Sequence, residues 1–170
     1  MKQREIKFRL RSASNKIVGY EKWYIGERDE ETGSYRAIPQ WLYSKDYKYW
    51  NPQEIFHRHK DQFTGLLDKN GKEIWEGDIV LYPDTYIESV DVGVGMMPVA
   101  QTQENSFFPV EFKNGIFGLE IKKSELLSDG FYSIEEIARE TSNVDLGDTL
   151  EVIGNIYENS GLLKVENKEE

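Results

Sequence analysis

The chain has 170 residues, and its 21 Lys and Arg against 31 Asp and Glu give a formal net charge of −10. A length of ~100–200 residues is typical of one domain. The absence of Cys excludes disulfides, thiolate zinc sites, iron–sulfur clusters and a Cys nucleophile. The acidic balance disfavours generic binding to DNA or to anionic membranes, because like charges repel.

The N-terminal segment alternates apolar and basic residues. Positions 6, 8 and 10 are Ile, Phe and Leu, whereas positions 7, 9 and 11 are Lys, Arg and Arg. This period of two predicts a half-buried strand. A turn at Asn15–Lys16 and a second strand over Ile17–Ile25 would complete a β-hairpin.

An aromatic stretch, Trp41–Trp50, precedes a helix-start signal. Asn51 is a typical N-cap, Pro52 suits the first helical position, and the side chain of Glu54 can reach back to the cap amide. We therefore expect a short helix from Pro52 to about Asp61.

The middle and the end of the chain have the pattern of short strands separated by turns. Asn70-Gly71 is a turn signal and Asn114-Gly115 a strong hairpin signal, because both residue types tolerate a positive φ. We expect strands over Ile79–Tyr82, Val110–Phe112, Ile116–Leu119 and Leu150–Tyr157. Regularly spaced short strands predict a small barrel or roll.

Three segments interrupt this pattern. Pro83–Pro109 is too long for an ordinary connection and indicates an inserted loop that is either mobile or binds a partner. Its apolar part, Val92–Ala100, is too short to cross a membrane as a helix, which takes about 18 or more residues. Ser133–Glu136 is a capping box that predicts a helix over 134–140, and residues 164–170 form a charged tail. With no secretion signal in the sequence, we expect a soluble cytoplasmic protein.

No catalytic, cofactor or metal site is expected from the residue spacing. His57 and His59 would point about 200° apart on a helix, so both cannot bind one metal. Asp145, Asp148 and Glu151 are more simply turn residues than an ion site. The glycines fit neither a phosphate-binding loop nor a nucleophile elbow. We expect a protein that is not an enzyme.

Basic and aromatic residues together could bind single-stranded nucleic acid, since rings stack on bases while cations attract phosphates. The competing interpretation is a core hairpin whose polar residues point outward, and the net charge favours it. The candidate nucleic-acid contacts of this alternative are Arg9, Arg11, Lys45, Tyr47, Lys48 and Trp50.

An ordered set of motifs resembles the YopX family, whose members are carried by bacteriophages and prophages. The most specific part runs from Thr64-Gly65-Leu66 to Gly77-Asp78-Ile79-Val80, and the closing part is Val152–Asn159. The sequence departs from the family pattern at Leu10-Arg11-Ser12, where Ala-Trp-Asp is usual, and Pro83–Pro109 has the character of an insertion.

The resemblance implies an SH3-like barrel in the C-terminal part and no known activity. We therefore expect an α+β, mainly β protein: an N-terminal β-hairpin plus short helix over 1–62, and an SH3-like β-barrel or roll over 63–163. Its expected function is that of a phage or prophage accessory protein in the bacterial host cell, binding a protein partner or self-associating as a homo-oligomer. The motif residues, which have structural explanations in turns and bulges, are Gly65, Gly71, Gly77, Asp78, Gly154 and Asn155.

Overall fold

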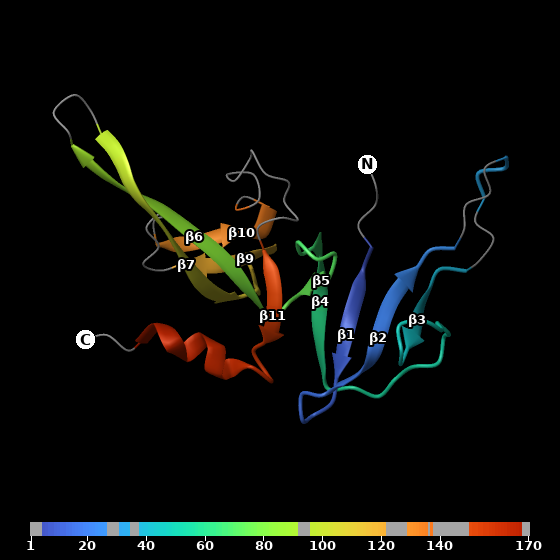
Figure 1. Ribbon diagram of the computed structural model, residues 1–170. Helices are drawn as coiled ribbons and strands as arrows, with labels where there is room; N and C mark the ends of the chain where they lie inside the picture. The colour runs from blue at the N-terminus through green and yellow to red at the C-terminus, as the bar shows by residue number, and fades with distance from the viewer. Residues whose placement is uncertain are drawn as a thin grey trace. The chain divides into compact units, whose positions relative to one another are not determined.

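The computed structural model describes residues 5–26, 31–34, 38–91, 96–121, 129–135, 137 and 150–167. The chain divides into two units, Met1–Gly65 and Leu66–Glu170, called the first and the second unit below. Strands make up most of the described residues, and they form antiparallel sheets (Figure 1). The prediction of a mainly β protein is confirmed.

The first unit is built on strands in the order β3-β2-β1-β4. The predicted N-terminal hairpin is confirmed, because Lys7 pairs with Lys22 and Arg9 with Tyr20 in antiparallel register. Asn15, with a φ of 61°, lies in the turn between the two strands. The strands are β1 (Lys7–Arg11), β2 (Ile17–Tyr24), β3 (Gln40–Ser44) and β4 (His59–Leu67), the last of which continues into the second unit.

The predicted helix over 52–61 is wrong. The N-cap signal is used, since Asn51 Oδ1 accepts a hydrogen bond from the backbone N–H of Gln53 at 2.8 Å, but no helical turn follows. Residues 53–57 have no regular secondary structure, and the chain from His59 onward pairs with β1 as part of β4. Pairing with a central strand therefore outweighs a local helix signal that spans only a few residues.

The second unit contains two three-stranded sheets, in the orders β11-β6-β7 and β10-β9-β8. The hairpin predicted around Asn114-Gly115 is confirmed: both residues have positive φ values, 52° and 86°, between paired strands. The elements are β5 (Glu73–Trp75), β6 (Asp78–Asp91), β7 (Met96–Pro109), β8 (Glu111–Lys113), β9 (Ile116–Ile121), β10 (Gly130–Ser133), β11 (Glu151–Asn155) and the 3₁₀ helix η2 (Ser160–Asn167).

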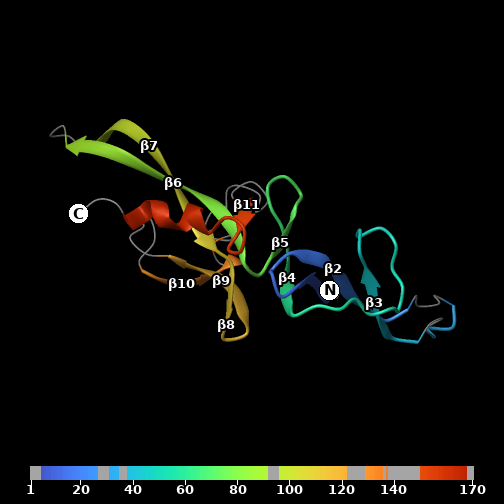
Figure 2. The same ribbon diagram turned by 90° about the horizontal axis from the view of Figure 1, so that it is seen from below.

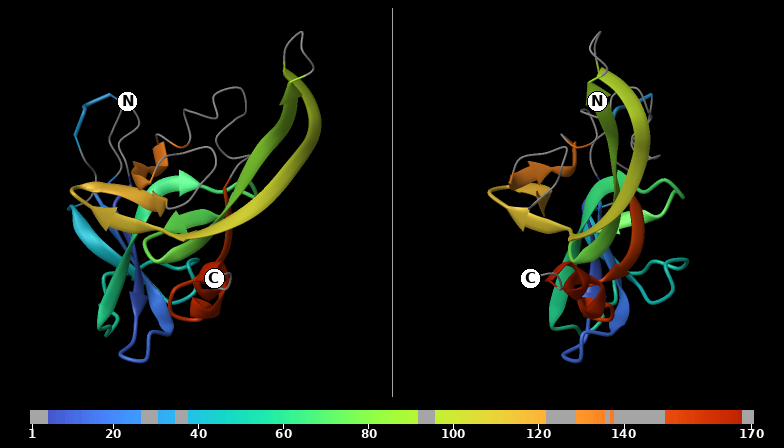
Figure 3. Two further views of the ribbon diagram at one scale, coloured as in Figure 1. Left: turned by 90° about the vertical axis from the view of Figure 1, so that its left-hand side faces the viewer. Right: turned by 60° about the vertical axis from the view of Figure 1, so that its left-hand side comes forward.

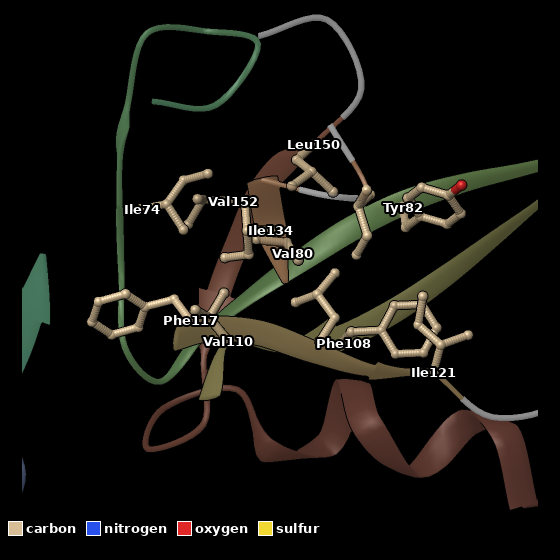
Figure 4. Packing of buried hydrophobic residues seen from close by; sticks show 12 residues of the cluster. Ile74, Val80, Tyr82, Phe108, Val110, Phe117, Ile121, Ile134, Leu150 and Val152 are labelled. Atoms are coloured by element: carbon tan, nitrogen blue, oxygen red, sulfur yellow. The ribbon is translucent and has the colours of Figure 1, made fainter. Parts of the chain in front are cut away.

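The core of the second unit lies between these two sheets. Figure 4 shows side chains from β6, β7, β9 and β11 meeting in one cluster, and Ile134 joins them from the segment after β10. Ile134, Glu135 and Ile137 are helical, whereas the rest of the predicted helix over 134–140 lies outside the described residues. Burial of one such aliphatic side chain contributes about 1.5–3 kcal/mol, so this cluster is the main source of stability in the second unit.

The strands described in the second unit do not close into a barrel, so the finer prediction of an SH3-like barrel is not realised in them. Instead, β6 and β7 continue together away from the sheet as a long ribbon (Figures 2 and 3). The segment 83–109 was predicted to be an inserted loop, but its described residues, 83–91 and 96–109, belong to the strands β6 and β7. At the C-terminus, η2 extends to Asn167, into the predicted charged tail.

Candidate functional site

The turn before β6 joins three segments of the second unit. Gly77, with a φ of 78°, donates its N–H to the carbonyl of Val110 at 2.8 Å and accepts the N–H of Ile156 at 2.9 Å. The Asp78 carboxylate accepts the N–H of Trp75 at 3.0 Å. A side chain other than hydrogen is strained at such a φ, which explains a glycine here.

Of the other motif residues, three lie in a turn or at a close approach, and one lies within a strand. Gly71, with a φ of 77°, is in the turn after Asp68, and Gly65 has a φ of 91° within β4. Gly154 follows a break in the β11–β6 register, and a Cβ there would lie 2.5 Å from the Asn159 side chain. Asn155 Oδ1 accepts two backbone N–H groups of the following turn, at 3.0 Å each. The contacts described for Gly71, Gly77, Asp78 and Asn155 are those of turn formation.

The basic face of β1 is buried in the first unit. Arg9 is 7% exposed and Arg11 is 0% exposed. Their Nε atoms lie 2.8 and 2.5 Å from the same atom, Oδ2 of Asp61. Asp61 comes from β4, the neighbour of β1. Neither arginine is presented to solvent for a phosphate, which removes two of the predicted nucleic-acid contacts from this conformation.

The aromatic candidates also have partners inside the first unit. Tyr47 packs edge-on against Tyr20 and against Trp50, with ring centres 4.7 and 5.4 Å apart, and its hydroxyl accepts a hydrogen bond from Lys7 Nζ at 2.8 Å. The ammonium of Lys22 lies 4.5 Å from the Trp50 ring centre. These rings therefore stack on protein groups, while Lys45 and Lys48 lie on the surface.

The part of the chain that the structure describes contains no group of three or more His, Asp and Glu side chains placed to hold a metal ion. Glu151 is paired with Lys69 at 2.6 Å, and the other two acids considered with it, Asp145 and Asp148, lie outside the described residues. No helix among the described residues is long and apolar enough to cross a membrane.

A pocket of about 690 Å³ opens in the first unit between the β2–β3 pair and the irregular segment 51–58. The sequence did not indicate this pocket, because a helix was predicted over the segment that forms its wall. Backbone hydrogen bonds between Tyr43 and Asn51, at 2.7 and 3.0 Å, hold one end of the segment, and Arg58 N–H to Arg11 O, at 2.7 Å, holds the other. The volume is within the ~300–1,000 Å³ of typical ligand sites.

Aromatic rings and charged groups line this pocket together. The rings are those of Tyr43, Tyr49 and Phe56, and the charged groups are Lys45, Asp46 and Glu54. Hydrogen bonds from the N–H groups of Lys48 and Tyr49 hold the pKa of Asp46 below its usual value, so it is ionised at neutral pH. Burial, and then the negative charges of Glu21 and Glu54, raise the pKa of the Tyr43 hydroxyl.

A second feature is the ribbon of β6 and β7, called the arm below and defined as Pro83–Asp91 with Met96–Asn105. The base of β6, Asp78–Leu81, pairs with β11 on one side and with β7 on the other. Along the arm, the described pairing is between β6 and β7 alone, from Pro83 opposite Asn105 to Asp91 opposite Met96. At roughly 3.3 Å per residue the arm is about 30 Å long. Figure 3 shows its two strands continuing side by side.

Comparison with known proteins places this chain in a family. No curated protein matches it. The crystal structure of protein EF1440 from Enterococcus faecalis matches with 22% sequence identity over 94% of this chain and 97% of that chain, at a TM-score of 0.38. The family model described as YopX protein matches residues 7–164, nearly the whole chain. The chain belongs to the YopX family.

Proposed function

We propose that this chain is a non-enzymatic accessory protein of a bacteriophage or prophage that acts in the host cytoplasm by binding protein through its arm. The phage context follows from what the resemblance to the YopX family implies. The observation that carries the binding role is the arm itself: a two-stranded ribbon, about 30 Å long, in which β6 and β7 pair only with each other among the described residues.

The proposed binding role depends on the edges of the arm. A strand at a sheet edge presents a row of backbone N–H and C=O groups, which can pair with a strand of another chain. A two-stranded ribbon is marginally stable in water by itself, so an added strand both stabilises the arm and binds the partner. The first residues of β7, Met96–Ala100, are apolar in sequence, which suits a contact that excludes water.

An arm-shortened variant tests this proposal. Residues 83–105 are replaced by Asn-Gly, so that Tyr82 and Ser106, which are paired in the structure, close a two-residue hairpin. The core residues Tyr82, Phe108 and Val110 all remain. The shortened chain is expected to keep a spectrum typical of β structure in circular dichroism and a cooperative thermal transition.

The readouts are the molar mass in solution and the proteins retained by the full chain from a host lysate. Loss of self-association, or loss of a specific retained protein, in the shortened chain supports the proposal. The same number of subunits in solution and the same retained proteins for both chains contradict it. A control variant, Ile38→Ala, removes a side chain that is 81% exposed in the other unit and should change neither readout.

A further inference from the structure

The pocket of the first unit has walls that are fixed without a ligand. The segment 51–58 is tied to β3 at Asn51 and to β1 at Arg58 by backbone hydrogen bonds. Between these ends, Ile55 packs over Gly19 of β2, where a Cβ would lie only 2.6 Å from Ile55 Cδ1. A preformed site avoids the entropic cost of ordering a loop on binding.

Two of the aromatic rings are presented to solvent. Tyr49 is 79% exposed and Phe56 is 78% exposed, although burial of either ring in a core would be more favourable in free energy. The guanidinium of Arg58 lies 5.1 Å from the Phe56 ring centre, so one cation is already attracted to this ring. Aromatic faces attract cations because the ring quadrupole is negative above its plane.

The charged residues that line the pocket give it a net negative charge. Asp46 and Glu54 contribute two carboxylates against the single ammonium of Lys45. The Asp46 carboxylate is held in place by hydrogen bonds from Ser44 Oγ and from the N–H groups of Lys48 and Tyr49. Its negative charge therefore acts on the pocket from a fixed position. Glu54 is exposed and can turn toward a ligand.

We propose that this pocket binds an organic cation, namely the guanidinium or alkylammonium group that ends an Arg or Lys side chain of a basic peptide. An anion would meet a lining of net negative charge on a chain of net charge −10. A purely apolar ligand would desolvate carboxylates without compensating them. A guanidinium satisfies both requirements, because it pairs with a carboxylate and stacks on rings. The pocket volume leaves room for the aliphatic stem beside the rings.

The probes are N-acetyl-Ala-Arg-Ala-amide, the same peptide with citrulline in place of Arg, and agmatine. Binding to the ¹⁵N-labelled full chain is followed by amide chemical shifts during titration. The Arg peptide is expected to shift signals of residues 43–56 in a saturable way, while the neutral citrulline peptide, which has nearly the same shape, binds at least about fivefold more weakly. Tighter binding of the peptide than of agmatine identifies a peptide as the source of the cation, and equal binding identifies a small amine.

Variants then assign the binding to this pocket. Tyr49→Ala and Phe56→Ala should each raise the dissociation constant about two- to fivefold, and Glu54→Gln should do the same by removing a charge. Lys45→Ala should lower it about twofold, because it removes a like charge. Ile38→Ala and Glu5→Gln remove an exposed apolar side chain and an exposed carboxylate of the same unit outside the lining, and they should leave it unchanged.

Three results overturn the proposal. One is the absence of saturable shifts with both the Arg peptide and agmatine. Another is equal affinity for the Arg and citrulline peptides, which would indicate a site for neutral amides. The third is binding that survives Tyr49→Ala, Phe56→Ala and Glu54→Gln unchanged, which would place the ligand elsewhere. Because the arm lies in the other unit, the arm-shortened variant should bind the Arg peptide normally, so failure of either proposal is distinguishable from failure of the other.

Discussion

The carboxylate of Asp68 accepts a hydrogen bond from the backbone N–H of Val152 at 3.0 Å, joining two positions 84 residues apart in the sequence. Its other oxygen accepts the N–H groups of Asn70 and Lys72, at 2.8 and 2.9 Å. The neighbouring Lys69 N–H donates to the carbonyl of Leu150 at 2.9 Å. One buried carboxylate therefore shapes the turn before β5 and attaches it to β11.

Replacing Asp68 by Asn should destabilise the second unit by about 2 kcal/mol, because charge-assisted hydrogen bonds are replaced and an amide N–H₂ now faces a backbone donor. Urea unfolding at pH 7 measures this difference. Asp46→Asn is the matched control, because the Asp46 carboxylate also accepts backbone N–H groups. Since Asp46 is exposed, water can replace these hydrogen bonds, and the loss of stability should be smaller. Equal losses for the two variants would contradict the role assigned to burial.

The same carboxylate gives a pH dependence with a definite sign. Burial alone raises the pKa of Asp68, but hydrogen bonds from Val152, Lys72 and Asn70, with the charge of Lys72, outweigh it and hold the pKa below its ordinary value. A folded-state pKa below the unfolded value of about 3.9 stabilises the fold above that pH, and this contribution is lost as the pH falls through the folded pKa. The stability difference between wild type and Asp68→Asn should therefore narrow below about pH 4. A constant difference from pH 7 to pH 3 would exclude this linkage.

Asp61 compensates two buried arginines, and its loss should be costly. Replacing Asp61 by Asn leaves the guanidinium groups of Arg9 and Arg11 without their shared carboxylate, and removing one partner of a buried ion pair costs about 3–5 kcal/mol. Glu21→Gln is a suitable comparison, since Glu21 is equally buried but its partner Lys60 is 40% exposed and can move into water. Thermal unfolding should show a clearly larger loss for Asp61→Asn. The reverse order would show that the two arginines do not depend on this carboxylate.

Local signals in the sequence predicted the parts of the fold that depend on a few neighbouring residues. The Asn114-Gly115 hairpin is one case, because a tight turn requires positive φ at both positions and these residue types supply it. The strand pair of the N-terminus is another, since alternation and a short turn are both local. At Asn70-Gly71 only the glycine has a positive φ, 77°, and its N–H closes the turn on the carbonyl of Asp68 at 2.9 Å.

Non-local contacts decided what the sequence could not predict. Alternation in β1 indicated that the basic side chains face solvent, yet Arg9 and Arg11 are buried because Asp61, about 50 positions later, lies beside them. The helix signal at Asn51-Pro52 was overridden when the following residues paired with β1. The pocket was missed for the same reason, since its wall is the segment that was expected to be helical.

Gly19 allows the segment 51–58 to approach β2, and a methyl group there should disturb it. A Cβ on Gly19 would lie 2.6 Å from Ile55 Cδ1 and 2.7 Å from the carbonyl oxygen of Ser44. Gly19→Ala should therefore destabilise the first unit by about 1–3 kcal/mol, the usual cost of overpacking. Adding Ile55→Val removes the flexible half of this clash but not the contact with Ser44, so the double variant should recover only part of the stability in urea unfolding. Full recovery would mean that β3 shifts without cost.

The rate of amide hydrogen exchange should differ between the two parts of β6, the base and the arm. From Asp78 to Leu81, β6 lies between β11 and β7 and beside the buried cluster, whereas from Pro83 to Asp91 it pairs with β7 alone among the described residues. Opening a two-stranded ribbon breaks hydrogen bonds to one neighbour and exposes little core, so it takes less free energy than opening the sheet. Amides in β6 between residues 84 and 91 should exchange faster than those of residues 79–81, and those of the base should change little in the arm-shortened chain. If a partner strand adds to the arm, the exchange of the arm amides should become slower in the complex. Uniform protection along β6 in the isolated chain would show that the ribbon is stable by itself. It would then have no energetic reason to accept another strand.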